Sequence, residues 1–405
     1  MIKINMFQAS YGDSLLVQVE KEAKKTINIM IDCGFNYKTN IKPNLKRLLK
    51  DQSINRFIIT HFDKDHIQSA SKFLEDNSNY KDENIALIEQ IWLNTFKHLQ
   101  FSKRNIEELS SEETNKVKSY ISETSSKSNS EINEGDIGAK QATTLGANIL
   151  EKKYPWNIDT GEEAICIENV QAVNITDDVK LHLLSPNKKR LQNLESEFRS
   201  KLSEMGLNPN SNGIFDDAFE LFNLENKDKK EEEGNISSSE KAINARTIKL
   251  FTNGENYIKD DSIGNGSSIS FILETDNKKI LILADAFAED IIEELKKKYT
   301  NECEYPIFFD AVKVSHHGSF RNNSPELFKI IDSDNFLFST NGKHPKHKHP
   351  DVETISCIIN RRLPVGVFHR NLVFNYELFH LKDFNDENLK IEFSYEIKVQ
   401  EETII

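Results

Sequence analysis

The feature that most constrains this chain is a short apolar run that ends in four possible metal ligands. Residues 57–60 read Phe-Ile-Ile-Thr, which predicts a buried β-strand, and His61, Asp63, Asp65 and His66 follow within six residues. Imidazole and carboxylate groups suit Zn²⁺, Mn²⁺ or Fe. We predict that Asp65 and His66 bind one cation at the mouth of the strand, while His61 and Asp63 face a second. The alternative is a charged surface turn.

The histidines are unevenly distributed. Seven of the eleven fall in three short runs, at positions 61 and 66, 316 and 317, and 344, 347 and 349. Histidines scattered through a core or a surface would not cluster in this way, so the pattern favours one shared site. A second apolar run, residues 27–31, also ends in a polar residue, Asp32. Polar residues that follow strands indicate a site at the carboxyl edge of a layered α/β sheet.

Strand and helix signals alternate along the chain, which predicts a sheet-containing layered α/β domain. Helical or strand structure is expected at 85–93, and terminal β structure at 379–399. The other expected strands are 15–19, 27–31, 57–60, 179–184, 268–274, 279–284, 311–314 and 336–339. The expected helices are 45–49, 67–74, 139–152, 188–201 (exposed and charged), 289–298, 325–331 and 354–361.

Two polar insertions interrupt this alternation, and we expect a single domain over residues 1–405 that contains both. Residues 102–138 are rich in Ser, Glu, Lys and Asn, which predicts a mobile insertion or an exposed helical excursion. The second insertion spans about 208–260, and its most polar part is 224–241. A solvated loop is the simpler interpretation of that part, and a segment that docks a protein partner is the alternative.

Composition narrows the class of protein. With 52 Lys and Arg against 65 Asp and Glu, the 405 residues carry a net charge of −13, which argues against a protein that coats nucleic acid through clustered cations. The 37% hydrophobic content fits a folded core with polar insertions. The four scattered cysteines form no C-x-x-C pair, and no run approaches the ~20 apolar residues of a membrane helix. These features, and a first apolar run too short for a signal peptide, predict a soluble cytoplasmic protein with no membrane partner.

The motif at 61–66 resembles a variant of the H-x-H-x-D-H motif of the metallo-β-lactamase superfamily. Further segments resemble that fold in the expected order, and together they are most similar to the ComEC-type branch, the hydrolase domain attached to bacterial DNA-uptake channels. The resemblance covers roughly 1–100 and 261–375. Its other segments are 11–16 (YGDSLL), 29–34 (IMIDCG), 265–268 (NGSS), 282–285 (ILAD), 313–319 (KVSHHGS) and 347–351 (HKHPD).

The resemblance implies a four-layer αββα metallo-β-lactamase sandwich that holds two divalent metal ions, Zn or Mn. It makes Asp285 the carboxylate that bridges the metals. One site would use His61 and Asp63, and the other would use Asp65, His66, Asp285 and either His316 or His317.

Two departures from the superfamily pattern affect the first of these sites. Asp63 stands where the superfamily has a second histidine, a variant familiar in the ComEC-type branch. The histidine usual between the motif and the bridging Asp has no clear counterpart. His98 and His182 are possible substitutes, and Asn265 or Ser267 are alternatives. The resulting oxygen-rich site should favour Mn²⁺ or bind metal weakly.

The remaining polar residues have predicted roles around the metals. Asp65 would help orient the attacking water, and His347 or His349 would protonate the leaving alkoxide, because imidazole titrates near neutrality. The alternative for loop 343–349 is a solvated basic loop, or one that holds a substrate phosphate. Asp13 and Asp32 would support the ligands by hydrogen bonding, or else simply form turns beside glycine.

The resemblance implies a metal-dependent phosphodiesterase, a nuclease acting on DNA or RNA or an enzyme for a small phosphodiester. Related hydrolases occur in bacterial anti-phage systems, so a role in anti-phage defence is a further expectation. One alternative is a metallohydrolase of a lactone, a thioester or another non-phosphate bond. Another is a non-catalytic partner-binding protein whose metal site has decayed.

Overall fold

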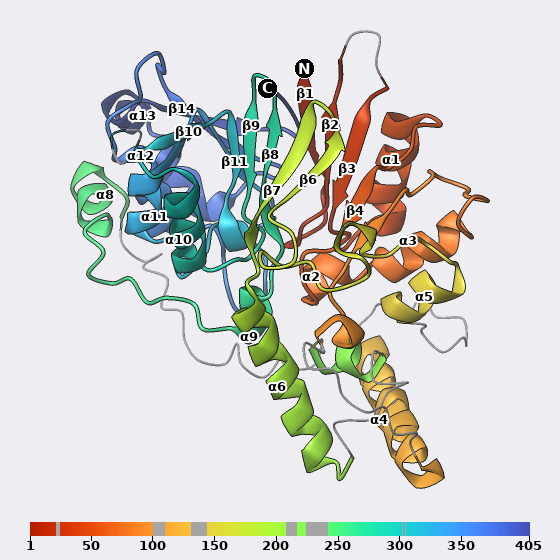
Figure 1. Cartoon of the computed structure of the whole chain (residues 1–405). Coiled ribbons are helices and arrows are strands. Elements are labelled where there is room, and N and C mark those ends of the chain that lie inside the picture. The colour runs from red at the N-terminus through yellow and green to blue at the C-terminus, as the bar shows by residue number, and fades with distance from the viewer. Residues whose placement is uncertain are drawn as a thin grey trace.

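The structure, a computed structural model, describes residues 1–21, 25–99, 110–130, 144–207, 217–223, 242–301, 303 and 305–405. Two large sheets stand next to each other, and helices lie on their outer sides (Figure 1). The predicted mixed α/β class is confirmed, and the arrangement is compatible with an α/β sandwich. Within the described parts of the chain, every helix is too short or too polar to cross a membrane.

The first sheet joins the two ends of the chain. Its order is β16 (Glu402–Ile404), β1 (Ile2–Met6), β2 (Leu15–Val19), β3 (Ile27–Ile31), β4 (Arg56–Ile58) and β5 (Ile91–Trp92). Strands β1 to β3 are antiparallel neighbours, and β4 and β5 continue the sheet in parallel. Because β16 pairs with β1, the last described strand completes the edge beside the first.

The second sheet combines an antiparallel half with a parallel half. Its order is β15 (Tyr395–Val399), β14 (Arg370–Phe374), β13 (Asn335–Phe338), β11 (Ala311–Lys313), β9 (Lys279–Ile282), β8 (Ser270–Thr275), β7 (Val179–Ser185) and β6 (Ala172–Thr176). Strands β6 to β9 form antiparallel hairpins, whereas β9 to β15 run parallel. A separate parallel pair joins β10 (Ile307–Phe309) to β12 (Ile331–Ser333).

Alternation along the strands explains why the sheets face each other. Ile4 and Val17 of the first sheet share one buried cluster with Phe271 and Ile280 of the second. Since successive strand residues point to opposite faces, the intervening residues of the central strands face outward against helices. The outer face of the first sheet shares a buried cluster with α1 (Lys42–Leu49), α3 (Ala70–Asn77) and α5 (Leu145–Glu151), and this cluster extends to α6 (Lys188–Glu204) below the sheet (Figure 1). That of the second packs against α8 (Ala245–Phe251), α10 (Ala288–Lys298), α11 (Pro325–Ile330), α12 (Val352–Ile359) and α13 (Glu387–Phe393).

Short helices lie at the carboxyl ends of the central strands. Helix α2 (Lys64–Ile67) follows β4, and the 3-10 turn η5 (Ser315–Gly318) follows β11. In Figure 1, α2 and α9 (Ile263–Gly266) lie at the lower end of the two sheets, and α6 and α4 (Ser111–Ser130) extend below them. The other short helices are η1 (Tyr37–Ile41), η2 (Phe96–Leu99), η3 (Ile158–Thr160) and η6 (Phe379–Asn385).

Two predicted elements differ from the structure. The predicted β structure at 379–399 is wrong over its first part, because η6 and α13 occupy it and only β15 is a strand. Asp386 accepts hydrogen bonds from two backbone amides at the start of α13, and this cap favours the helix. The predicted helix at 67–74 is divided between α2 and α3.

Helix α6 was expected to be exposed, but it buries an apolar stripe. Leu191, Leu194, Phe198 and Leu202 are all buried, at the spacing of one helical face. Most of the charged residues that dominate its sequence lie on the remaining faces, and the buried Glu195 pairs with Arg199.

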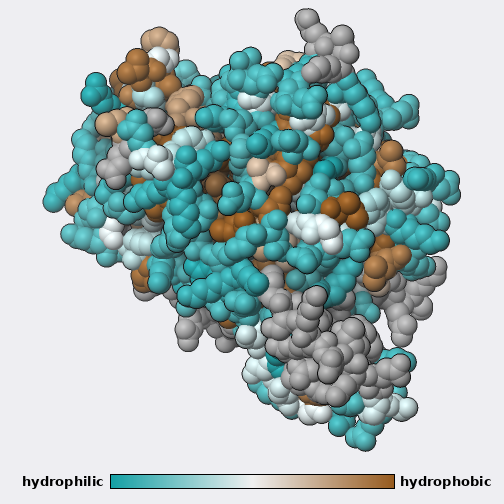
Figure 2. Space-filling model, in the orientation of Figure 1, coloured by the Kyte–Doolittle hydropathy of each residue, from teal (hydrophilic) through white to brown (hydrophobic). Residues whose placement is uncertain are grey.

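The two polar insertions are described in part. Residues 111–130 form α4, which agrees with the helical excursion, and residues 102–109 and 131–138 lie outside the described residues. Residues 224–241 also lie outside them. The face seen in Figure 2 is mostly hydrophilic, with small separate apolar groups, as 29% charged residues would produce.

Candidate metal centre

Loops at one end of the two sheets bring a buried cluster of Asp and His side chains together. Two groups within it could each hold a metal ion, because their ligand atoms all lie within 4.8 Å of one another. Site 1 is defined here as His61, Asp63 and Asp285, and site 2 as Asp13, His66, Asp285 and His317. Asp285 belongs to both groups. The predicted ligand motifs, more than 200 residues apart in sequence, therefore converge on one carboxylate.

Site 1 is built on the residues that directly follow β4. His61 Nε2 lies 3.1 Å from Asp63 Oδ2 and 3.8 Å from Asp285 Oδ2. Its other ring nitrogen, Nδ1, lies 3.0 Å from the hydroxyl of Thr60. That contact fixes the ring so that Nε2 points toward the two carboxylates.

Site 2 spans both sheets. His66 Nε2 lies 3.4 Å from Asp285 Oδ1 and 3.8 Å from Asp65 Oδ2, and His317 Nε2 lies 3.1 Å from the same Asp65 oxygen. Asp65 is therefore placed between the two histidines of site 2, although it is not one of the four residues that define the group. Asp13 approaches His317 from the far side of the ring, with its Oδ1 3.4 Å from Nδ1.

Hydrogen bonds orient both imidazoles of site 2. Asp32 Oδ2 lies 2.7 Å from His66 Nδ1, and the Asp32 carboxylate also accepts hydrogen bonds from the amide and hydroxyl of Thr60. His317 Nδ1 lies 2.7 Å from the carbonyl oxygen of Ser339, and Lys313 Nζ pairs with Asp13 at 2.8 Å. Asp32 thus lies where the sequence predicted a supporting residue. Asp13 contacts His317 in the same manner, and it also has an oxygen within reach of site 2.

The adjacent histidines 316 and 317 point to different sites. His316 Nε2 lies 3.6 Å from Asp285 Oδ2, the oxygen that faces site 1, whereas His317 belongs to site 2. Both residues have positive φ angles, 44° and 53°, which turn the chain sharply between them. Such strained backbone gathers at functional sites. The sequence left open whether His316 or His317 is a ligand of the second site. In the structure, one of these histidines lies beside each site.

His316 has its own polar support. Its Nδ1 lies 2.8 Å from Asn322 Oδ1 and 3.4 Å from Asn265 Nδ2, and both amides donate to Asp260. Asn265 therefore lies behind His316 at site 1, near the place for which the sequence offered it as a ligand.

The other substitutes that the sequence offered lie elsewhere. His98 is buried in the core, where its Nδ1 bonds Thr95 and its ring packs against Trp156. His182 pairs with Glu274 on the second sheet, and the Ser267 hydroxyl donates to the Gly264 carbonyl. Neither histidine is in either group of ligand atoms found among the described residues.

Two glycines allow the loops to close around Asp65. A Cβ at position 12 would lie 2.0 Å from the Asp65 carbonyl oxygen, and one at position 34 would lie 2.3 Å from it. Contacts this short are impossible for any residue with a side chain. Gly12 and Gly34 thus have a steric function: they let the backbone of Asp65 approach closely. For these glycines, the sequence indicated only turns beside Asp13 and Asp32.

The donor atoms of the cluster fit a cation. Among the described residues, Nε2 of His61, Nε2 of His66 and both carboxylate oxygens of Asp285 are buried without a hydrogen bond of normal geometry. Burying such groups unpaired is costly, and a cation at each site would satisfy one histidine nitrogen and one oxygen of Asp285. Nitrogen and carboxylate oxygen are ligands of Zn²⁺ and Mn²⁺.

The electrostatics of the cluster lead to the same conclusion. Burial disfavours an imidazolium, but the carboxylates of Asp285, Asp32 and Asp65 outweigh burial and raise the pKa of His66 well above its usual range. In the same way, Asp13 and Asp65 overcome burial and raise the pKa of His317 to about 9. Burial would raise the pKa of Asp285, but His316 and His66 hold it well below its usual range. The site thus stabilises positive charge, which protons supply when no metal is bound.

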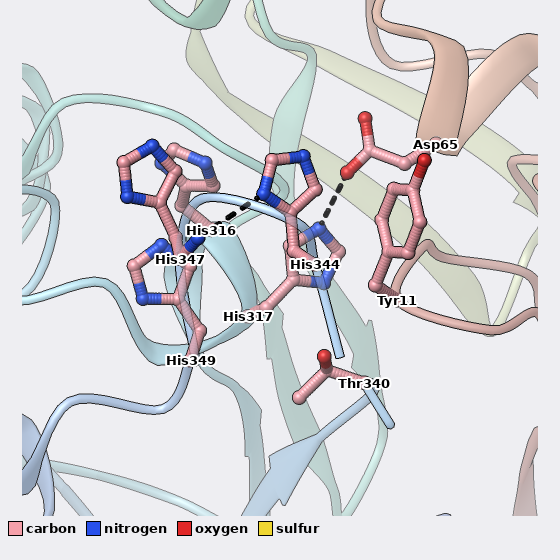
Figure 3. Close-up of a pocket in the computed structure, with 8 residues that line it drawn as sticks. All are labelled: Tyr11, Asp65, His316, His317, Thr340, His344, His347 and His349. Atoms are coloured by element: carbon pink, nitrogen blue, oxygen red, sulfur yellow. Dashed lines mark hydrogen bonds and ion pairs between the residues drawn. The ribbon is translucent and has the colours of Figure 1, made fainter. Parts of the chain in front are cut away.

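A pocket opens beside the cluster on the side of residues 340–349. Figure 3 shows the histidines of this loop turned toward His316 and His317, with Tyr11 and Asp65 on the opposite wall. His349 lies 5.4 Å from His316 between ring centroids, and its Nδ1 lies 3.2 Å from Asp351. The pocket is lined by Tyr11, Asp65, His316, His317, Thr340, His344, His347 and His349.

Three of these lining residues were not among the predicted site residues. His344 belongs to the third histidine run, so its clustering was the available signal. Tyr11 precedes the glycine that contacts Asp65, and its ring lies 4.8 Å from that of His344. Thr340 follows β13, and no sequence feature distinguishes it. Among the supporting residues, Asn322 and Asp260 were also missed, because no local pattern links them to His316.

No protein-family model matches this chain, and a search of curated proteins found no match. The possible chemistry is therefore inferred from the side chains themselves.

Proposed function

We propose that this protein is a metal-dependent phosphodiesterase of the metallo-β-lactamase superfamily, similar to its ComEC-type branch, and that it cleaves DNA or RNA. The observation that carries the proposal is the shared carboxylate of Asp285 between two adjacent Asp/His groups. Pairs of neighbouring metal ions are the usual means of clamping the attacking and leaving oxygens of a phosphodiester.

The fold and the order of the motifs support the same assignment. The two facing sheets with helices on both outer sides are compatible with the four-layer αββα sandwich that the motifs imply. The motifs lie in loops at one end of the sheets, as the superfamily resemblance requires. His316 would supply the histidine that site 1 otherwise lacks.

Bound at these two sites, divalent ions would polarise a phosphate and make a water molecule more acidic. The remaining chemistry falls to the side chains of this chain. Asp65, between His66 and His317, would accept a hydrogen bond from the attacking water and so orient it. His349 would donate a proton to the leaving oxygen from its Nε2, since Asp351 lies at its Nδ1. His347, with its ring 5.7 Å from that of His349, is the second candidate for this step.

A cationic loop at the pocket would favour a polyanionic substrate. Lys343, Lys346 and Lys348 are exposed and alternate with the histidines that line the pocket. Residues 341–350 contain no Asp or Glu, in contrast to the acidic chain as a whole. This loop could bind phosphates on either side of the cleaved bond.

The test combines metal analysis of the purified protein with a panel of single-stranded and duplex DNA, RNA and small phosphodiesters, with and without EDTA. We expect about two ions per chain and cleavage that EDTA abolishes. Asp285→Asn should reduce cleavage by about a hundredfold or more, whereas Asp276→Asn, at an exposed carboxylate far from the site, should not. Hydrolysis of a lactone or thioester without phosphodiester cleavage would select the alternative hydrolase. A protein purified without chelator that binds no metal would favour the partner-binding alternative.

A further inference from the structure

The side chain between the two ligands of site 1 points away from the metal centre. Phe62 separates His61 from Asp63 in sequence, and its ring is buried, 5.3 Å from the ring of Phe219 at an interplanar angle of 82°. Phe219 belongs to the helical residues 217–223, which lie in the second polar insertion. A ligand pair of the candidate metal centre is therefore in direct contact with an insertion.

Phe62 is the end of a larger aromatic cluster. The ring of Phe219 also lies 5.2 Å from Phe198 of α6 and 6.0 Å from Phe96 of η2, and Phe198 lies 5.4 Å from Phe222. All five rings are buried. Aromatic pairs at these separations each contribute about 0.5–1.5 kcal/mol beyond the area they bury. The cluster thus joins the metal-ligand loop to three segments that are far apart in sequence.

A polar contact anchors the insertion segment at a distance from the metals. The carboxylate of Glu220 accepts hydrogen bonds from the backbone amides of Leu145, at 2.9 Å, and Gly146, at 3.3 Å. These amides begin α5, where a negative charge is favoured by the helix dipole. Glu220 and Phe219 are neighbours, so this contact holds the ring against Phe62.

Site 2 also meets this loop, because the backbone amide of His66 donates to the Asp63 carbonyl at 2.9 Å, but it has support outside the loop as well. Its imidazoles are oriented by Asp32 and by the Ser339 carbonyl, both of which directly follow strands of the two sheets. A displacement of residues 217–223 would therefore act on the chain at 62, and with it on His61 and Asp63, more directly than on the imidazoles of site 2.

From this contrast we infer that Phe62 is a positioning residue, through which the helical insertion affects the metal affinity of site 1 more strongly than that of site 2. The inference rests on the proposed two-metal function. It assigns the second insertion a regulatory role: whatever stabilises residues 217–223 against α6 also favours the second ion, and whatever displaces them releases it.

The test is calorimetric titration of the full-length, chelator-treated protein with Zn²⁺ and with Mn²⁺. Phe219→Leu removes the ring contact without altering the metal-binding motif. We expect it to weaken one of the two binding events by about tenfold or more and to change the other by a much smaller factor. Phe328→Leu is the matched control, since it removes a buried ring from the opposite outer core and should leave both events unchanged.

A second variant guards against misfolding of the first. Glu220→Gln keeps the volume of the side chain and weakens the anchor to α5, so it should lower the same affinity by a smaller factor. If both variants, Phe219→Leu and Glu220→Gln, bind two ions with wild-type affinities, this inference is overturned and the proposed function is not. A wild-type chain that binds neither metal would overturn the proposed function as well, which separates the two failures.

Discussion

The two halves of the candidate metal centre share Asp285 but differ in what holds their other ligands. In site 2, strand-end hydrogen bonds orient His66 and His317, and these bonds belong to the central sheets. In site 1, the Thr60 hydroxyl orients the His61 ring, but His61 and Asp63 also flank Phe62, which packs against an inserted helical segment. The difference therefore suggests a permanent site beside an adjustable one, which is a way to couple metal occupancy to events elsewhere in the molecule.

The largest expected effect is the loss of metal from both sites at once. Asp285→Ala removes the carboxylate that both sites share, so we expect both metal ions to be lost, with affinity reduced by about a hundredfold or more at each site. Metal analysis after dialysis against a weak chelator measures this directly. Retention of one ion per chain would show that Asp285 serves a single site.

The next largest effects are expected from substitution of the two neighbouring histidines, one at each site. His317→Ala should abolish binding at site 2, and His316→Ala should weaken site 1, because their Nε2 atoms face different carboxylate oxygens. Calorimetric titration of both variants with Zn²⁺ measures the two affinities. Loss of the same binding event in both variants would mean that the two residues serve one site.

A smaller effect is expected from the residue that orients His66. Asp32→Asn replaces one carboxylate oxygen by an amide and weakens the 2.7 Å contact with His66 Nδ1. The affinity of site 2 should fall by about 10- to 100-fold, with a much smaller change at site 1. This pattern is opposite to that expected for Phe219→Leu, so the two titrations together test whether the sites are supported separately.

The last effect concerns pH and the stability of the metal-free protein. In metal-free protein, the pKa of His317 is raised from 6.5 to about 9, so its protonation stabilises the fold fully below about pH 6.5. That stabilisation, about 3 kcal/mol at most, should be lost as the pH rises toward 9. Thermal unfolding of chelated protein between pH 6 and 9.5 should show the decline. Metal-loaded protein should not show it, because a bound imidazole is already neutral. A parallel decline in both forms would assign the effect to another group.

Much of the fold was predictable because its signals are local. Short apolar segments identified the strands at 15–19 and 27–31, and the strands predicted at 268–274 and 279–284 correspond to the antiparallel pair β8 and β9. The tail was wrong because the buried residues of η6 and α13 are sparse, and their helical spacing was mistaken for strand. Helix α6 is charged on most of its surface, which concealed the apolar stripe that binds it to the core.

The candidate site was predictable where ligand types cluster and unpredictable where contacts are tertiary. The motif at 61–66 and the paired histidines indicated a shared cluster, and the structure brings their side chains together. The opposite directions of His316 and His317 depend on positive φ angles that the sequence did not signal. The contact of Phe62 with Phe219 joins residues 157 positions apart, and no periodicity specifies such a pair.

The pairing of β16 with β1 has a consequence for how the chain folds. Ile4 lies opposite Thr403, so the edge of the first sheet is completed by residues almost 400 positions away. Closing so long a loop has a large entropic cost, and contacts of this separation slow the search for the native topology. During synthesis, this edge of β1 therefore has no strand partner until β16 emerges. A variant lacking residues 400–405 should accordingly reveal whether this final pairing is the step that commits the protein to its native state.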